Sequence, residues 1–502
     1  MINNILNFGK VNFFRLLFMI IPLFICLAAF EASAVEFYID NNIGNDSNSG
    51  LSSSSPWKSL SKIDDHSFSS GDKIFLKKGQ IWNEDLNLDV SGSAAAPVTV
   101  DAYGSGILPE IRGGTISGAY ITIKNLIIDR AKTDDDALRL RGVNSIILQN
   151  LTIRNGLQDG LDVARTVDLL IDSCQIHHFL AGSYTNQVDA HGIAIVKSQD
   201  IVIRNTEIHH VSGDSLQADS EREETNLTNN ILIEDCHFWT GPLSENFNSG
   251  WIKTDDKPDG QKQYPGENAI DTKVLKFGWE NYPPMSVTIK RMKAHGWKND
   301  DFIDNKAVFN LKENVEVTLD DITVYDSEIA FRLRGTRGNA DVSINNATIS
   351  NCEVAVRAED DLQNLQIINS DFGTGIGTQI LFAGGDGGKD SWIFKNNTFF
   401  DRKPEIASDP SNIVTDGTVS DTKVILKWNP NDEGDLAGYN IYFGTSSRDY
   451  GLPIPVGKIT EYSLKNLEVG KVYYFAVTSF DLSGNESGFS KEISLNYKEG
   501  EK

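Results

Sequence analysis

Cysteines and basic residues are scarce in this sequence. It has 4 cysteines among 502 residues, and because Cys26 lies in an N-terminal apolar run, the rest of the chain keeps an odd number of them. A disulfide framework is therefore excluded as the main source of stability. With 46 Lys and Arg against 70 Asp and Glu, the formal net charge is -24, which argues against nucleic acid as a partner. An anionic polymer would bind only where basic residues or a bound cation reverse the field locally.

Long apolar runs are absent except for one, from Leu16 to Phe30. It follows Lys10 and Arg15 and leads to the small residues that end at Ala34, a pattern typical of a cleavable signal peptide. The run is shorter than the roughly 20 residues that a helix needs to cross a bilayer. We therefore expect cleavage of residues 1–34 near Ala34 and a secreted chain, extracellular or periplasmic, without a membrane span.

Internal repetition is the strongest signal. Segments of the form apolar, polar, Asn/Asp/Ser, any, any, apolar recur, mostly 23 to 32 residues apart. They cover residues 123–128, 148–153, 171–176, 203–208, 233–238, 289–294, 319–324, 344–349, 367–372 and 394–399. This spacing is typical of a β-solenoid, in which each strand pairs with its equivalent in the next coil. Because no sustained helical periodicity lies between the segments, we predict an all-β fold, a right-handed parallel β-helix of about ten coils.

The end of the repeats divides the chain into domains. We expect the β-helix with its N-terminal cap over residues 35–404, a linker over 405–411, a second domain over 412–497 and a tail over 498–502. Cys174 and Cys236 occupy the same position in repeats two coils apart, about 9 to 10 Å. A disulfide needs closer Cα atoms, so both cysteines should be buried as small apolar residues.

Both ends of the chain resemble known families. Residues 38–40 (YID), 44–50 (GNDSNSG), 56–57 (PW), 71–76 (GDKIFL) and 96–100 (APVTV) together resemble the start of many β-helix polysaccharide lyases. Trp57 and Leu60 should plug the open end of the solenoid there. The strands expected at 424–428, 438–442 and 473–477 resemble a fibronectin type III β-sandwich, with Trp428 in its core and Tyr473 as the tyrosine-corner residue. That resemblance implies a spacing or attachment role.

A second family of expected strands precedes the repeats. It covers residues 136–141, 159–164, 191–196, 214–219, 268–273, 301–306, 329–334 and 354–359. The third and fifth residues are mostly apolar or small and should point inward, so the fourth and sixth face solvent. This alignment places Asp271 and Asp304 about 4.8 Å apart on neighbouring coils, with Asp300 and Asp301 close by. Oxygen ligands at this spacing suit Ca²⁺, and a solvated acidic face balanced by Lys and Arg is the alternative.

The same face resembles family nine of the polysaccharide lyases. The resemblance lies in residues 268–273 (NAIDTK), 300–304 (DDFID) and 330–333 (AFRL). It implies that Asp300, Asp301 and Asp304 bind calcium, and that Arg332 occupies the place of the family's catalytic lysine. Three positions differ from the family pattern: Asn268 replaces an aspartate, Phe302 replaces a glycine, and arginine stands at the base position.

The residue types on this face fit β-elimination of a uronate, in which the carboxylate is neutralised and the C5 proton is removed. A lysine or arginine beside other cations has its neutral form favoured and can act as the base. Lys273 is the first candidate and Arg332 the second, because arginine deprotonates with difficulty. His191 is a further candidate acid or base. For each, a plain salt bridge or structural contact is the alternative.

Several other residues are candidates for substrate binding. Gln217, Lys306 and Arg334 fall in the outward columns of the second strand family. Trp251 and Lys253 lie in the segment from residue 239 to 282, which interrupts the repeats, and long insertions often border binding sites. Packing of this segment onto the solenoid is the alternative for its aromatic residues.

These observations favour a secreted, calcium-assisted lyase for an acidic polysaccharide, working as a monomer. A glycoside hydrolase on the same fold would need a compact carboxyl pair, for which Asp162, Asp271 and Asp304 are available. A uronate epimerase would use the same proton abstraction. A non-catalytic protein that binds polysaccharide is a third class, because fold alone does not decide function.

Overall fold

The structure is a computed structural model. It describes residues 34–219, 228–253, 264–273, 279–298, 302–336 and 339–415, and in the C-terminal domain 424–431, 433, 436–451, 453–456, 458–464, 470–481 and 486–497. The expected signal peptide, apart from Ala34, lies outside the described residues, as do Asp300 and Asp301. No helix in the described part of the chain is long and apolar enough to span a membrane.

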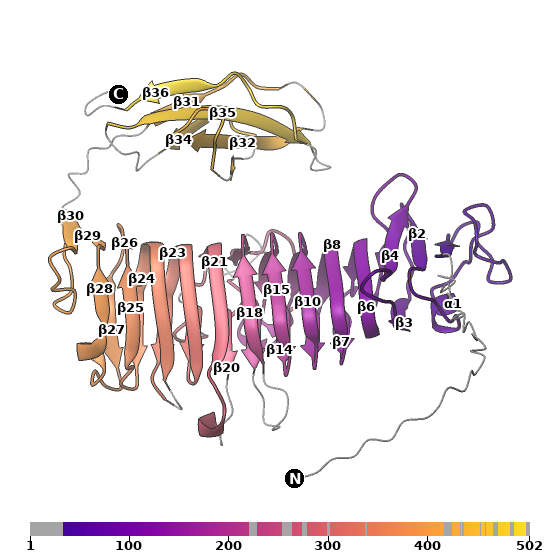
Figure 1. Cartoon of the computed structure of the whole chain (residues 1–502), viewed down its shortest axis with the longest axis horizontal. Coiled ribbons are helices and arrows are strands. Elements are labelled where there is room, and N and C mark those ends of the chain that lie inside the picture. The colour runs from indigo at the N-terminus through magenta and orange to yellow at the C-terminus, as the bar shows by residue number, and fades with distance from the viewer. Residues whose placement is uncertain are drawn as a thin grey trace, which may run out of the picture.

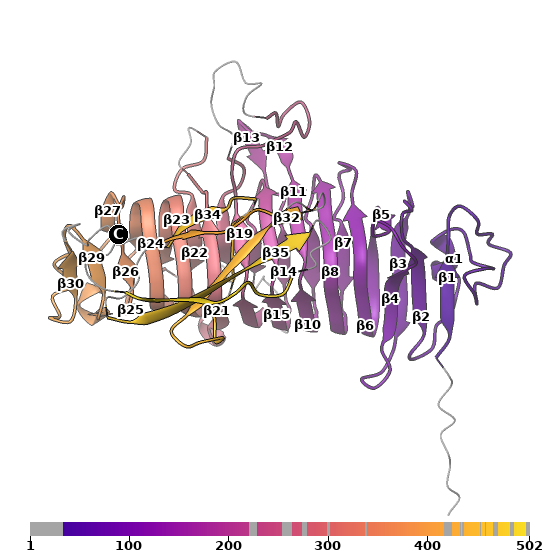
Figure 2. The ribbon, with the colours of Figure 1, turned by 90° about the horizontal axis from the view of Figure 1, so that it is seen from above.

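Parallel strands stack side by side along the long axis of a solenoid (Figures 1 and 2), which confirms the predicted parallel β-helix. The strands form three faces. Face 1 contains β3 (Asp85–Ser91), the start of β6 (Gly113–Asp129), β7 (Leu138–Arg141), β9 (Leu161–Ala164), β14 (Ile193–Val196), β17 (Leu216–Asp219), β20 (Asn268–Lys273), β22 (Ala307–Lys312), the ends of β23 (Val315–Arg334) and β24 (Ala340–Glu359), and β27 (Thr378–Ala383).

The other two faces complete each coil. Face 2 contains β1 (Glu36–Ile39), β2 (Lys73–Lys77), β4 (Val98–Tyr103), β8 (Asn144–Gly156), β10 (Val167–Asp172), β15 (Gln199–Arg204), β18 (Asn229–Glu234), β21 (Met285–His295), β25 (Asn364–Ile368), β28 (Ile393–Lys395) and parts of β6, β23 and β24. Face 3 contains β5 (Glu110–Ile111), β11 (Gln175–Phe179), β16 (Glu207–Val211), β19 (His237–Trp239), β26 (Asp371–Phe372), β29 (Thr398–Phe400), β30 (Ile413–Thr415) and parts of β6, β8, β21, β23 and β24.

The third residue of each repeat forms the corner between face 2 and face 3. In all ten repeats this residue has a positive φ, between 49° and 59°, as in Asn125, Asn150 and Asp321. Asn and Asp tolerate this left-handed conformation better than other non-glycine residues. The polar residue in the sequence motif is therefore explained by the backbone, and Arg291 is the one departure from the Asn/Asp/Ser pattern.

Aliphatic side chains from all three faces fill one continuous core along the solenoid. Trp57 and Leu60 are buried at its N-terminal end, as predicted, next to the short helix α1 (Ser61–Asp64). Cys174, Cys236 and Cys352 are free and buried, which confirms the prediction for the first two. Burial raises the pKa of each of the three thiols to about 12.

Stacked aromatic rings line the outer side of face 3. His177, His209 and Trp239 follow one another at centroid distances of 4.8 Å and 4.5 Å, and the stack continues through His295 to Tyr325. Beside it, His178 and His210 stack at 5.0 Å, and His237 contacts His295. Six of the 8 histidines of the chain lie in this histidine ladder, because the His-His pairs of β11 and β16 occupy the same register on adjacent coils.

The solenoid ends with β30, which pairs in parallel with β29. Its pairing continues to Thr415, further along the chain than the expected end at residue 404 and past the expected linker. A separate antiparallel sandwich follows: β31 (Val424–Lys427) pairs with β34 (Glu461–Leu464), and β33 (Ile454–Pro455), β32 (Leu436–Gly444), β35 (Val472–Asp481) and β36 (Ile493–Asn496) form a second sheet. It has its own core, in which Tyr473 is buried and against which Trp428 packs.

Candidate functional site on face 1

Two columns of side chains run along the outer side of face 1. The first column follows from the strand register and consists of Thr115, Arg139, Asp162, Ala194, Gln217, Asp271, Asn310, Arg332 and Arg357. On the earlier coils the second column consists of Arg141, Ala164, Val196, Asp219 and Lys273. On the later coils it continues with Lys312, Arg334 and Glu359. The sequence predicted both columns correctly except on one coil.

On that coil the strand is residues 307–312, not the expected 301–306. Asp271 therefore lies beside Asn310 rather than Asp304, which is exposed in the turn before β22. Lys306 is 1% exposed and its Nζ donates a hydrogen bond to the Tyr264 carbonyl oxygen at 2.9 Å. The predicted substrate-binding role of Lys306 is therefore wrong, and the paired position in the second column belongs to Lys312.

The physical reason for this shift is the apolar pattern. The expected frame would have turned Ile303 and Asn305 inward, whereas the observed frame buries Phe309 and Leu311 completely. Phe309 also stacks on Phe331 of the next coil at 5.2 Å. The sequence AVFNLK carried this signal, because it matches IAFRLR of the following coil residue by residue.

Asp271 lies between two lysines. Lys312 Nζ is 2.9 Å from one of its carboxylate oxygens and 3.1 Å from the other, and Lys273 Nζ is 4.0 Å away. Burial and the nearby Asp214 raise the pKa of Asp271 to about 7, although both lysines oppose this shift. Lys273 is the more exposed of the two lysines, at 39% against 16%.

The predicted calcium ligands are not brought together in the described part of the chain. Asp271 is paired with Lys312 rather than with other predicted ligands, and Asp304 does not lie beside it. Asp300 and Asp301 lie outside the described residues. No group of three His, Cys, Asp or Glu side chains among the described residues is placed to hold a metal ion.

Three arginines converge on Glu359 at the C-terminal end of the columns. Arg332 Nε lies 3.0 Å from Glu359 Oε1, Arg334 Nη2 lies 2.8 Å from Oε2, and Arg357 Nε lies 2.6 Å from Oε1. Although burial opposes it, the hydrogen bonds from these guanidinium groups lower the pKa of Glu359 to about 2. Because arginine keeps its charge in proteins, Arg332 is better suited to binding an anion than to acting as a base.

A polar ladder borders the first column. The backbone N–H of His191 donates to Asp159 at 2.7 Å, the N–H of Asp214 donates to His191 Nδ1 at 2.9 Å, and Asn268 donates to Asp214 at 2.7 Å. His191 and Asp214 are buried. The ring of His191 thus holds the turn of the next coil, and its Nε2 lies 3.2 Å from Gln217 Nε2 at the surface of face 1.

Carboxyl groups gather at the N-terminal end of the ladder. Burial, together with Asp159 and Asp162, raises the pKa of Asp136 to about 6, and burial raises the pKa of Asp159. Arg141 forms an ion pair with Asp162. Carboxyl groups are therefore concentrated toward the N-terminal end of face 1, and cations are concentrated toward its C-terminal end.

The insertion after β19 does not offer Trp251 to a ligand. Trp251 is fully buried among Leu180, Tyr184 and Phe247, and its Nε1 donates to the Ala181 carbonyl oxygen at 3.2 Å. The predicted substrate-binding role of Trp251 is wrong, because the ring instead joins the insertion to the hairpin β12 (Ala181–Ser183) and β13 (Asn186–Val188), which projects from the solenoid (Figure 2). Lys253 is half-buried, and its backbone N–H donates to Asn246.

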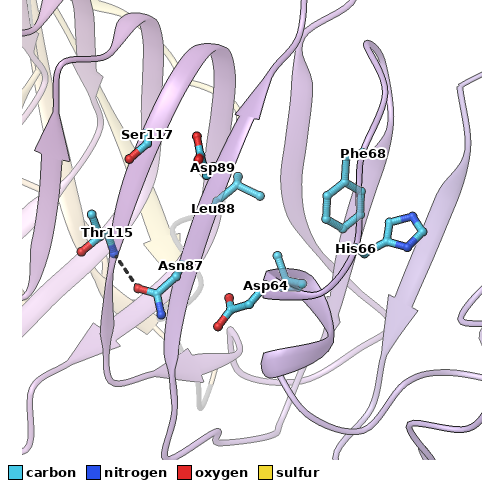
Figure 3. Close-up of a pocket in the computed structure, with 9 residues that line it drawn as sticks. Asp64, His66, Phe68, Asn87, Leu88, Asp89, Thr115 and Ser117 are labelled. Carbon is cyan, nitrogen blue, oxygen red and sulfur yellow. Dashed lines mark hydrogen bonds between the residues drawn. The ribbon is translucent and has the colours of Figure 1, made fainter.

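A separate hollow of about 310 Å³ lies at the N-terminal end of face 1 (Figure 3). Asp64, His66 and Phe68 come from the region of α1, and Asp89 and Ser117 come from the facing strands β3 and β6. Asp89 and Ser117 pair with each other and extend the second column onto the first coils of face 1, away from the cations near Glu359.

Comparison with known proteins supports the division into two domains. Residues 113–241 match the family model described as a right handed beta helix region, and residues 408–496 match the fibronectin type III domain. A lacto-N-biosidase of Bifidobacterium longum subsp. longum is 32% identical over 151 residues, which cover 28% of this chain and 9% of that protein. The chain thus spans less than a tenth of the length of this relative.

Solved structures with a similar arrangement have low sequence identity. Pectate lyase Pel9A has a TM-score of 0.45 at 14% identity, covering 63% of this chain and 77% of its own. An alginate lyase from Paenibacillus sp. str. FPU-7 has a TM-score of 0.41 at 14% identity, covering 70% and 98%. A GH136 lacto-N-biosidase from Eubacterium ramulus has a TM-score of 0.38 at 14% identity, covering 76% and 67%. The matched family models show that this chain contains a right-handed β-helix region followed by a fibronectin type III domain.

Proposed function

We propose that this chain is a secreted lyase that cleaves an acidic, uronate-containing polysaccharide by β-elimination. The supporting observation is a row of cations on four successive coils of face 1, in a chain with a net charge of -24. The row consists of Lys273, Lys312, Arg332, Arg334 and Arg357. Such a row reverses the field locally and attracts an anionic polymer.

We assign the proton transfer to Lys273, on the basis of its position beside Asp271. β-Elimination removes the C5 proton of a uronate and breaks the bond from C4 to O4, so that a double bond forms between C4 and C5 and the departing O4 takes up a proton to become a hydroxyl group. Lys312 is held by Asp271 at 2.9 Å, whereas Lys273 lies 4.0 Å away and is more exposed. Lys273 is thus the less tightly held of the two lysines, and its neutral form is the one that accepts the proton.

The remaining residues of the row orient the substrate. Arg332 is a permanent cation held in place by Glu359, so it binds a carboxylate of the polymer at a sugar beyond the reacting one. Calcium binding through Asp300, Asp301 and Asp304 is a separate proposal, and no step above passes through a metal ion. Treatment with a chelator tests it independently.

A second candidate function is glycoside hydrolysis. Asp136, Asp159 and Asp162 form a carboxyl cluster in which the pKa of Asp136 is raised to about 6, as a general acid requires. The stretch of 151 residues shared with a lacto-N-biosidase also favours this function.

One assay separates these functions. Purified protein is incubated with pectate, alginate, glucuronan and glycosaminoglycans, with calcium or with chelator, while ultraviolet absorbance of unsaturated uronates and reducing ends are measured. For a lyase we expect absorbance to grow, and Lys273→Ala to abolish it while Lys290→Ala, on face 2, does not. Reducing ends without absorbance, lost in Asp136→Asn, would establish the hydrolase. Absence of both signals would favour a binding protein.

A further inference from the structure

Glu359 is surrounded by more positive charge than its single carboxylate can neutralise. A carboxylate offers about four acceptor positions, and five contacts from Arg332, Arg334 and Arg357 fill them, at 2.6 to 3.4 Å. Asp360 adds one further carboxylate, 3.4 Å from Arg334. Three guanidinium groups therefore face two carboxylates, and like charges this close repel one another.

The arginines keep donors that no described residue uses. Arg332 and Arg334 each bind Glu359 through Nε and Nη2, and Arg357 uses Nε for Glu359 and Nη1 for Asn305, at 2.6 Å. Nη1 of Arg332, Nη1 of Arg334 and Nη2 of Arg357 have no hydrogen-bond partner among the described residues. They are also not among the buried polar atoms that lack one, so they reach solvent. The side chains are 19%, 26% and 22% exposed.

This cluster lies on the same two columns of face 1 as Asp271 and Lys273. Arg332 follows Asn310 and Asp271 in the first column, so the cluster begins two coils from Asp271. Two coils correspond to about 10 Å. On the coil after Arg357 and Glu359, the two columns continue with Leu381 and Ala383, which carry no charge. The cluster is therefore the end of the cationic row, at a distance from the reacting bond.

We propose that Arg332, Arg334 and Arg357 form a preassembled subsite for a carboxylate of the glycan, with Glu359 as the residue that positions them. Glu359 holds the guanidinium groups in place before the ligand arrives, and their outward N–H groups receive the carboxylate oxygens. This inference rests on the proposed function for its ligand class, an acidic polysaccharide. It adds a specificity requirement: the polymer must carry a carboxylate at a sugar remote from the one that reacts.

The test measures binding separately from cleavage. The probes are oligogalacturonate, oligomannuronate, oligoguluronate and oligoglucuronate, each compared with its carboxyl-reduced form by titration calorimetry. We expect tight binding of at least one carboxylated probe, and Arg357→Gln should weaken it roughly tenfold or more. Arg357→Lys should lose most of the same affinity, since lysine lacks the planar fork of donors. Arg291→Gln is the matched control, because Arg291 pairs with Glu234 and Asp235 on another side of the solenoid.

Glu359→Gln distinguishes positioning from simple charge. If Glu359 only neutralised the arginines, its removal would strengthen binding of an anion, whereas loss of positioning weakens it. Unchanged binding in Arg357→Gln, tighter binding in a folded Glu359→Gln, or no carboxylate-dependent binding of any probe would each overturn the subsite. Different results reject the two proposals. Arginine-dependent binding without unsaturated products would support the subsite and reject the lyase. Unsaturated products with an unchanged KM in Arg357→Gln would support the lyase and reject the subsite.

Discussion

The histidine ladder on face 3 should make the solenoid sensitive to acid. Burial lowers the pKa of His209 to about 2 and that of His177 to about 3, each further lowered by neighbouring histidines. Burial likewise lowers the pKa of the other four rings: His178 and His295 to about 4, and His210 and His237 to about 3. Unfolded histidines titrate near pH ~6.5. Below that pH the unfolded chain therefore binds protons that the folded protein excludes.

The sign and size of the effect follow from this difference. The stability provided by the neutral rings is complete above pH ~6.5 and is lost as the pH falls toward the folded pKa values, by about 1.4 kcal/mol per pH unit for each histidine. His209→Phe keeps a ring between His177 and Trp239 but removes one titrating group. Allowing for partial exposure of the ladder, the variant should lose about 2 kcal/mol less than the parent between pH 7 and pH 4.5.

Urea unfolding followed by tryptophan fluorescence at several pH values measures this difference. The comparison uses the pH dependence of the free energy of unfolding, so any change in stability at pH 7 cancels. His66→Phe is the control, because His66 packs against Phe37 and Trp57 in the N-terminal cap, outside the ladder. Parallel pH profiles for His209→Phe and the parent protein would refute the reasoning, and His209→Gln repeats the test if the phenylalanine is poorly tolerated.

Three further predictions concern stability and reactivity. Asn150→Ala should destabilise the solenoid by about 1 kcal/mol, whereas Asn150→Gly should cost less, because only glycine accepts φ near 51° without strain; chemical unfolding measures both. Trp251→Ala should lower the free energy of unfolding by about 3 to 5 kcal/mol, and an unchanged unfolding midpoint would contradict its place in the small core beside Tyr184. The three buried thiols should not react with a thiol reagent in the native state and should react fully in denaturant, so rapid labelling of the native protein would contradict the burial of Cys174.

The fold could be predicted because its signals are periodic. An Asn or Asp at the third position of each repeat marks a left-handed corner, and the apolar residues on either side mark the strands. The failure on one coil shows the limit of this reasoning. Residues 301–306 were expected as a member of the second strand family, but the burial of Phe309 and Leu311 decides the register.

The candidate site was harder to predict, because it depends on contacts between coils. Lys312 and Arg357 were not recognised as functional residues, and their roles become visible only beside Asp271 and Glu359. Trp251 lies in an insertion without periodicity, so its burial against the β12–β13 hairpin left no signal in the sequence.

The middle of face 1, where its carboxyl-rich part borders the cationic row, favours proton transfer. Asp271 lies next to the buried Asp214 on one side and next to Lys312 on the other. Burial and Asp214 raise the pKa of Asp271 to about 7, although Lys312 and Lys273 oppose this shift. A carboxyl group with a pKa near neutrality exchanges its proton readily near pH ~7. The acid–base chemistry is therefore expected at the coil of Asp271 and Lys273, with binding of the polymer extending toward Glu359.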